Sequence, residues 1–219
     1  MIRNFDLYAP TAPKEKRIQF IREVRCVSSL FERFYIPSKE TGSAWKIIVD
    51  VVPKITKPDC YLTLGAINIQ VEGNINDYFK LDDFNKKKIA LDYLMSGVAD
   101  VANQLKYEMN QFIIPQKKVI DSNYLNEWTF NKPTKNKSKT LSAELLIEHG
   151  IKEASLSLVF KDKQGNIVRK EHLVSTLPHE FCFYEYLGKL NWINDSLVEL
   201  KYKKNHHQFT VEVNEVKLR

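Results

Sequence analysis

The chain has 219 residues, of which 43% are hydrophobic and 27% are charged, and its formal net charge is +6 at pH 7. This composition is ordinary for a globular protein and excludes disorder along the whole chain. A folded chain of this length buries roughly 70% of the surface of its extended form, so it can build a core without disulfides or structural metals.

The positive charge is concentrated in one short segment. Residues 1–129 carry a net charge of +2 and residues 130–219 one of +4. The second value equals the charge of four lysines with no acid between them: Lys132, Lys135, Lys137 and Lys139. A nucleic-acid binder more often spreads its basic residues over one face. The ratio of 26 lysines to 7 arginines also argues against sequence-specific reading of DNA or RNA, because arginine makes the bidentate contacts to bases.

The three cysteines, Cys26, Cys60 and Cys182, are far apart and form no CxxC pair. This number and spacing exclude a disulfide framework and a zinc module, and they indicate buried thiols in a reducing compartment. The first residues lack the apolar run of a signal peptide, and no segment approaches the roughly 20 apolar residues of a membrane span. We therefore expect a soluble, cytoplasmic protein.

The first predicted element is a helix over residues 14–35, where apolar residues recur at helical spacing. Two strands are predicted after it. Residues 45–52 form a β-branched run that Pro53 ends. The second strand spans residues 61–71, and both of its alternating sets begin with apolar residues, which is typical of a strand covered on both faces.

The longest predicted helix spans residues 84–111 and carries a continuous apolar stripe. Asp82 or Asp83 is expected to cap its N-terminus, and the sequence Ile113-Ile114-Pro115 is expected to end it. A pair of strands covered by one long helix is an α+β layer. The pattern over residues 121–128 is short and ambiguous, and it is compatible with one or two helical turns.

The basic segment that follows is predicted to be a loop. Residues 131–139 contain Pro133, four lysines and no apolar residue. Two alternatives remain for this segment. Residues 130–140 are a linker between an N-terminal portion, 1–129, and a C-terminal portion, 141–219, or they are a long exposed loop inside one domain.

The last third of the chain alternates apolar and polar residues and predicts about five antiparallel strands. We expect them at residues 141–148, 154–161, 167–174, 197–203 and 208–214. The second and third of these form a hairpin around Gly165-Asn166, and residues 203–207 are the turn of the last hairpin. The aromatic-rich segment 181–192 fits a strand, a short helix or a cover over one end of the sheet. The predicted fold class is therefore α+β.

No familiar catalytic or cofactor-binding motif occurs in the chain. Its seven glycines form neither GxGxxG nor GxxxxGK[ST], so the known nucleotide-phosphate loops are excluded. The chain contains no HExxH zinc motif and no GxSxG nucleophile elbow. His206 and His207 are adjacent, and adjacent side chains of a strand point to opposite faces, so a solvated turn explains them better than a shared metal. We expect no cofactor and no metal.

One enzymatic alternative stays open. A hydrolytic or metal-dependent site would be assembled from residues that are scattered in the sequence, because catalytic partners normally meet across the fold. The candidates are Glu144, His149, His172 and Cys182. In the structural alternative, Cys182 packs among the aromatic residues on either side of it.

Two charged segments are candidates for contact with a partner. One lies at the start of the long helix and contains Asp77, Asp82, Asp83, Lys86, Lys87 and Lys88. A carboxylate at a helix N-terminus stabilises the helix by about 0.3–1 kcal/mol, which accounts for one or two of the acids. The lysines also fit a solvated face that pairs with these acids. The other candidate is the lysine segment 132–139.

In general character the chain resembles a bacterial immunity protein of a toxin–antidote system. It is small, α+β, rich in Lys, Asn and Ile, and without an evident catalytic set. The resemblance implies a non-catalytic protein that binds and blocks a cognate toxin domain, and it assigns no individual residue.

This chain differs from many immunity proteins in its charge. Those that oppose nucleases are often acidic, whereas this chain is +6. The resemblance therefore implies an acidic partner or a largely apolar contact, with the segment 132–139 or the region 77–88 at the contact surface. The alternatives are the enzyme described above and a weak nucleic-acid-associated module that uses the lysine segment.

Overall fold

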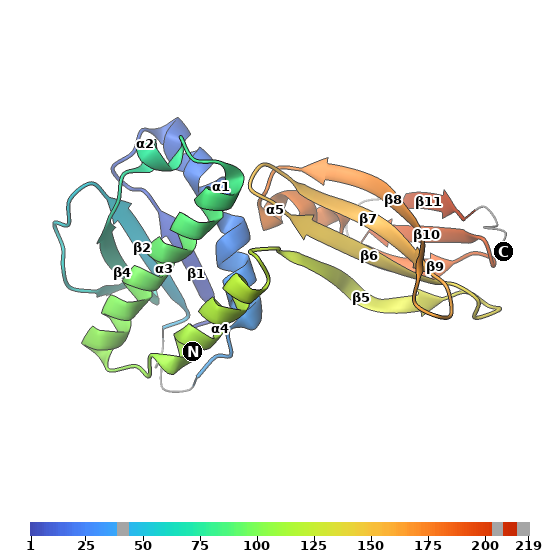
Figure 1. The fold of residues 1–219 in the computed structure, drawn as a ribbon, viewed down its shortest axis with the longest axis horizontal. Helices are drawn as coiled ribbons and strands as arrows, with labels where there is room; N and C mark the ends of the chain where they lie inside the picture. The colour runs from blue at the N-terminus through green and yellow to red at the C-terminus, as the bar shows by residue number, and fades with distance from the viewer. Residues whose placement is uncertain (39–43, 203–207, 214–219) are drawn as a thin grey trace. The chain divides into compact units, whose positions relative to one another are not determined.

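The computed structural model describes residues 1–38, 44–202 and 208–213, and Figure 1 draws it as a ribbon. The chain forms two compact units, Met1–Asn126 and Glu127–Arg219. The first combines helices with a mixed sheet, and the second is built mainly from antiparallel sheets. The predicted α+β class is therefore confirmed. Among the described residues, no helix has both the length and the apolar character that a membrane crossing requires.

The sheet of the first unit has four strands in the order β1-β2-β4-β3. Three strands run parallel, and β3 joins the edge in the antiparallel direction. Their bounds are β1 (Asn4–Tyr8), β2 (Lys46–Val52), β3 (Tyr61–Thr63) and β4 (Ala66–Glu72). The prediction of β2 is confirmed, whereas β1 was not predicted, because five residues give too short a pattern.

The single strand that was predicted over residues 61–71 is wrong. Residues 61–72 instead form the hairpin of β3 and β4, and the chain reverses at Leu64 and Gly65, which both have a positive φ. Two features of the backbone at Gly65 require glycine. Its φ is +80°, and an added Cβ would lie 2.7 Å from the indole ring of Trp45.

Helices cover one face of this sheet (Figure 1). They are α1 (Lys14–Phe34), α2 (Ile75–Tyr78), α3 (Asp83–Leu105) and α4 (Asn110–Asp121). The prediction of α1 is confirmed. The ring of Phe5 in β1 packs against Phe31 of α1 and Phe112 of α4. Gly97 lets α3 lie close to the sheet, because a Cβ there would come within 2.5 Å of a methyl group of Val49.

The helix predicted over residues 84–111 ends earlier than expected. α3 stops at Leu105, where Lys106 takes the left-handed conformation with a φ of 60°. A second helix, α4, then runs through Pro115, so this proline does not end a helix. Proline removes one backbone hydrogen bond, and α4 tolerates the loss at a position where the ring is buried.

The open edge of β1 is covered by side chains from α1. The backbone N–H of Phe5 donates to Glu32 Oε1 at 2.7 Å, and Arg25 donates to the carbonyl of Phe5 at 3.1 Å. Arg25 and Glu32 also form an ion pair at 2.6 Å. Unpaired strand edges invite further strands to add, and these two side chains occupy the groups that an added strand would use.

The second unit contains two antiparallel sheets, with the strand orders β5-β6-β7-β8 and β11-β10-β9. The first sheet consists of β5 (Glu127–Lys135), β6 (Ser142–His149), β7 (Ala154–Lys161) and β8 (Ile167–Thr176). The second consists of β9 (Gly188–Trp192), β10 (Leu197–Tyr202) and β11 (Gln208–Glu212). All five predicted strands are therefore present, while β5 and β9 are additional. The turn predicted at residues 203–207 lies outside the described residues.

The two sheets of the second unit share one hydrophobic core. Leu145 and Leu158 of the first sheet belong to the same buried cluster as Val198 and Leu200 of the second. The unit is therefore a sandwich of two sheets. The aromatic-rich segment 181–192 contributes the short helix α5 (Glu180–Phe183), a 3₁₀ turn and β9.

The loop that was predicted over residues 131–139 is wrong for its first half. β5 extends to Lys135, but its register against β6 shifts between Phe130 and Thr134. Residues 131–133 form a bulge there, since four steps along β5 match two steps along β6. Most side chains of this strand are exposed at the edge of the sheet, which explains why its composition looked like that of a loop.

Candidate functional site

A groove opens in the second unit beside the edge strands β5 and β9. It consists of two neighbouring hollows of about 670 and 550 Å³, which share Thr134 and Asn191. We call them together the β5–β9 groove. Both strands lie at an edge of their sheet, so main-chain groups as well as side chains reach the groove.

Five lysines line the β5–β9 groove, and the only acid in its lining is Asp195. The lysines are Lys132, Lys135, Lys137, Lys189 and Lys201. Lys201 pairs with Glu199 at 3.0 Å. The other four are exposed and form no ion pair with any residue that the structure describes. Such a concentration of one charge raises the local concentration of ligands with the opposite charge.

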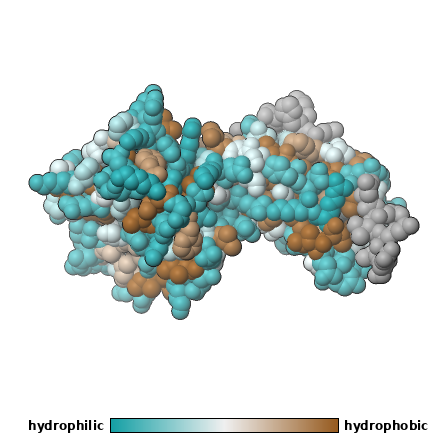
Figure 2. Space-filling view, turned by 45° about the horizontal axis from the view of Figure 1, so that its top comes forward, coloured by the Kyte–Doolittle hydropathy of each residue, from teal (hydrophilic) through white to brown (hydrophobic). Residues whose placement is uncertain are grey.

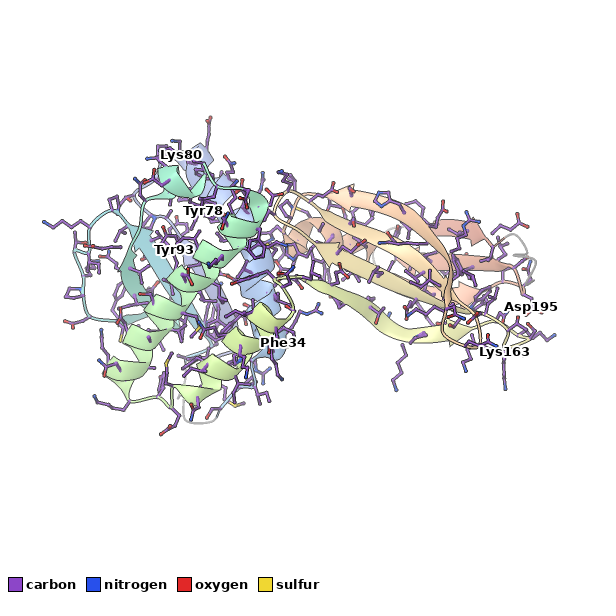
Figure 3. All side chains as sticks on the ribbon, in the orientation of Figure 1. Phe34, Tyr78, Lys80, Tyr93, Lys163 and Asp195 are labelled. Carbon is purple, nitrogen blue, oxygen red and sulfur yellow. The ribbon has the colours of Figure 1, made fainter. Side chains whose placement is uncertain are left out.

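The turn between β5 and β6 is organised around Asn136, which is only 3% exposed. The side-chain oxygen of Asn136 accepts hydrogen bonds from the backbone of Thr140 at 2.9 Å and of Leu141 at 3.1 Å. Its amide group donates to the carbonyl of Asp195 at 3.1 Å. The carboxylate of Asp195 (labelled in Figure 3) accepts from the N–H of Ser138 at 2.8 Å. This turn therefore has a defined conformation.

Two side chains bridge the walls of the groove. Asn131, in the bulge, donates to the carbonyl of Gly188 at 3.1 Å. Farther along, the indole N–H of Trp192 donates to the carbonyl of Thr134 at 2.8 Å. These bonds tie the two walls together at two points, and Leu190 lies between them on β9. Of the four lysines predicted in this segment, Lys132, Lys135 and Lys137 line it, while Lys139 is exposed in the adjoining turn.

The predicted acidic residues of region 77–88 have local roles. Asp82 caps α3 by accepting from the N–H of Asn85 at 2.8 Å. Hydrogen bonds from Asn85 hold the pKa of Asp82 below its ordinary value. Asp77 pairs with Lys80 at 2.7 Å, and Asp83 is the first residue of α3. A partner contact through these acids stays a prediction.

The three lysines of this region do not form one surface. Lys86 is 7% exposed and its ammonium group pairs with Glu23 at 2.7 Å. Its prediction as part of a solvated contact face is therefore wrong. Lys87 donates to the carbonyl of Tyr124 at 3.1 Å, and Lys88 is exposed. No sequence signal distinguishes Lys86 from its neighbours, because only the pairing of α3 with α1 buries it.

Tyr78, which is labelled in Figure 3, belongs to the buried cluster around Lys86. The ammonium group of Lys86 lies 5.5 Å from the centre of the Tyr78 ring. Burial raises the pKa of Tyr78, and the negative charge of Glu23 raises it further. The hydroxyl group is thus kept neutral. The cluster joins α1, α2 and α3, and we assign it a structural role.

Two of the four residues of the enzymatic alternative, Glu144 and His149, are held apart by β6, while His172 lies on β8 and Cys182 in α5. Glu144 and His149 lie five positions apart on β6, which pairs regularly with β7, so their side chains point to opposite faces of the sheet. His149 is 2% exposed and its ring packs against Phe183. Glu144 pairs instead with Lys161. In the described part of the chain, no three His, Cys, Asp or Glu residues are arranged to hold a metal ion.

Asp50 is a buried acid that sequence reasoning missed. It lies in β2 between Tyr8 of β1 and Gln70 of β4 and is 7% exposed. Burial raises the pKa of its carboxyl group to about 6, although the nearby Lys57 ammonium group lowers it. Its place in the apolar run of β2 is the signal that could have found it.

Exposed isoleucines of α4 are a candidate surface for the apolar contact that the resemblance implied. Figure 2 shows hydrophobic residues at the surface of the first unit between hydrophilic ones. Three isoleucines of α4 are about half exposed, Ile113 at 44%, Ile114 at 55% and Ile120 at 48%. These side chains line neither hollow of the β5–β9 groove, and they carry no charge that would select a partner.

Comparisons of the chain with protein-family models, with curated proteins and with solved structures found no match. The chemical character of the β5–β9 groove follows from the residues that line it. Lysines, asparagines and partly buried aromatic rings line it.

Proposed function

We propose that the protein is a non-catalytic binding protein that holds an acidic segment of a partner protein in the β5–β9 groove. The observation that carries this proposal is the set of five lysines that line the groove. Four of them have no ion-pair partner within the described residues. Carboxylates of a partner would supply the missing charges and would direct the partner to the groove.

The proposed biological role is that of an immunity protein, which neutralises a cognate toxin domain in the cytoplasm. Its net charge of +6 favours an acidic surface on the toxin over the basic surface of a nuclease. Complementary charges speed the association of two proteins and fix their register. Both effects suit an antidote that must find its toxin quickly.

A nucleic acid is the alternative ligand for a basic groove. Single-stranded binders stack bases on exposed aromatic rings. Here the ring of Trp192 packs against Phe160 at 6.0 Å between centres, and Tyr202 packs against Tyr186 at 5.7 Å. These rings are engaged in the unit, whereas the peptide groups of β5 and β9 offer hydrogen bonds that a polypeptide can match.

Fluorescence anisotropy with a ten-residue peptide of alternating Glu and Thr tests the proposal. Reversing three groove charges in the variant Lys132→Glu, Lys135→Glu, Lys189→Glu is expected to weaken binding about tenfold or more, which corresponds to about 1.4 kcal/mol. The matched control changes three exposed lysines of the first unit, Lys14, Lys54 and Lys117, to Glu. It is expected to alter the affinity less than about twofold, because these lysines do not line the groove.

Two results would contradict the proposal. One is an equal loss of affinity in the groove variant and in the control, which would show a response to net charge alone. The other is tighter binding of a twelve-residue oligothymidylate than of the peptide, with an affinity that falls steeply as salt is added. That outcome would favour the nucleic-acid alternative.

A further inference from the structure

We infer that the acidic segment binds as an extended strand that adds to β9 at Leu190, between the side-chain bonds at Gly188 and Trp192, an inference that rests on the proposed function. β9 is the outer strand of the sheet β11-β10-β9. It pairs with β10 on one side, and its other side borders the β5–β9 groove. An unpaired strand edge presents a row of N–H and C=O groups that another strand can match.

The direction of the peptide groups of β9 follows from two hydrogen bonds. The carbonyl of Gly188 accepts from Asn131, so it points away from β10. The N–H of Ile193 donates to Leu197, so it points toward the β10 side. In an antiparallel ladder these directions alternate along the strand. Leu190, two residues after Gly188, therefore directs both its N–H and its C=O into the groove.

The Leu190 side chain does not fill the groove. Leu190 lines the groove, yet it is 7% exposed and belongs to the core between the sheets. What Leu190 offers to the groove is therefore mainly its peptide backbone. The side-chain bridges at Asn131 and Trp192 lie on either side of it, so the free peptide groups of Leu190 occupy the span between the two bridges.

The lysines explain why the added strand should be acidic. Lys189 of β9 lies opposite Lys201 of β10 in the ladder, so both side chains stand on the same face of the sheet, away from the core. An added strand presents every second side chain to that face. Acidic residues at alternate positions would meet Lys189, while Lys201 is already paired with Glu199 and Lys132 lines the groove from β5.

In this mode of recognition the main chain and the side chains contribute differently. Main-chain hydrogen bonds to β9 would give affinity, and the lysines would select acidic residues at every second position. The expected ligand class is thus an extended segment of alternating acidic and small polar residues. A helix with the same number of carboxylates would bind less well, because its peptide groups are already paired.

Two isomers of the Glu-Thr peptide test the inference on the full chain. One isomer carries N-methyl groups on every Glu and the other on every Thr, so both have the same charge and the same number of methyl groups. In an added strand, only one of the two sets of N–H groups points to β9. We expect one isomer to bind about tenfold more weakly than the other, while the better one stays within about threefold of the unmodified peptide.

Amide hydrogen exchange gives an independent readout. Saturating unmodified peptide is expected to slow the exchange of the Leu190 amide about tenfold or more and to leave the amides of β7, in the middle of its sheet, unchanged. Equal affinities of the two isomers together with unchanged exchange at Leu190 would overturn strand addition but leave the proposed acidic ligand standing. If the unmodified peptide does not bind, the proposed function and this inference fail together.

Discussion

Replacing Asp50 by Asn is expected to stabilise the first unit at alkaline pH and to leave it unchanged at acidic pH. The carboxyl group of Asp50 is buried, which raises its pKa from the ordinary 3.8 to about 6, although Lys57 partly opposes the shift. The rise of the pKa from 3.8 to about 6 corresponds to at most about 3 kcal/mol. Screening by solvent reduces the free energy of unfolding that removal of the carboxylate should recover to about 1–2 kcal/mol.

The sign of the pH dependence follows from the direction of the shift. Because the pKa is higher in the folded state, the protonated group contributes stability that is fully present below 3.8 and is lost as the pH rises through about 6. Asn cannot ionise, so the variant avoids this loss. We expect the variant to be more stable than the wild type by about 1–2 kcal/mol near pH 8 and equal to it within about 0.5 kcal/mol near pH 4.

Urea unfolding of the full chain, followed by thiol labelling of Cys26, measures this difference. Cys26 lies in α1 and is 1% exposed, so its labelling reports the opening of the first unit. The matched control is Asp100→Asn in α3, at an exposed position, and it should change the stability by less than about 0.5 kcal/mol. A variant at Asp50 that is less stable near pH 8, or that gains the same amount at both pH values, would refute the reasoning.

Three further substitutions test the packing and the groove. Gly97→Ala is expected to cost about 1–3 kcal/mol in the Cys26 assay, because the new Cβ meets Val49 at 2.5 Å; an unchanged stability would mean that α3 moves freely. Lys86→Met should cost about 3–5 kcal/mol by leaving Glu23 buried without its partner, and adding Glu23→Gln should recover part of that loss. Asn136→Ala should destabilise the second unit by about 2 kcal/mol, measured as faster hydrogen exchange in β6, and should weaken binding of the Glu-Thr peptide. Normal peptide binding by that variant would show that the turn does not position the groove lysines.

In the second unit, the strands that sequence reasoning found alternate apolar and polar residues. β7 alternates buried leucines with serines, and this contrast gives the period of two that predicts a strand. β5 lacks it, because its edge position leaves most side chains exposed on both faces. β1 has the alternation, but its five residues are too few to separate the pattern from chance.

The candidate site was predictable only in part. The lysine segment stood out by its composition, and three of its four lysines line the β5–β9 groove. The opposite wall could not be found, because Lys189 and Lys201 approach the segment only once the two sheets pack together. The prediction that Lys86 is solvated was wrong for a related reason, because its partner Glu23 lies 63 positions away in the sequence.

The bulge in β5 has a topological consequence for the sandwich. If β5 ran straight from Phe130 to Thr134, its edge could align with that of β9, and the two sheets would join there into one continuous sheet. The register shift at residues 131–133 interrupts this alignment and keeps the two edges unpaired. Shortening the bulge by two residues should let the edges pair, and the protein would then lose the β5–β9 groove.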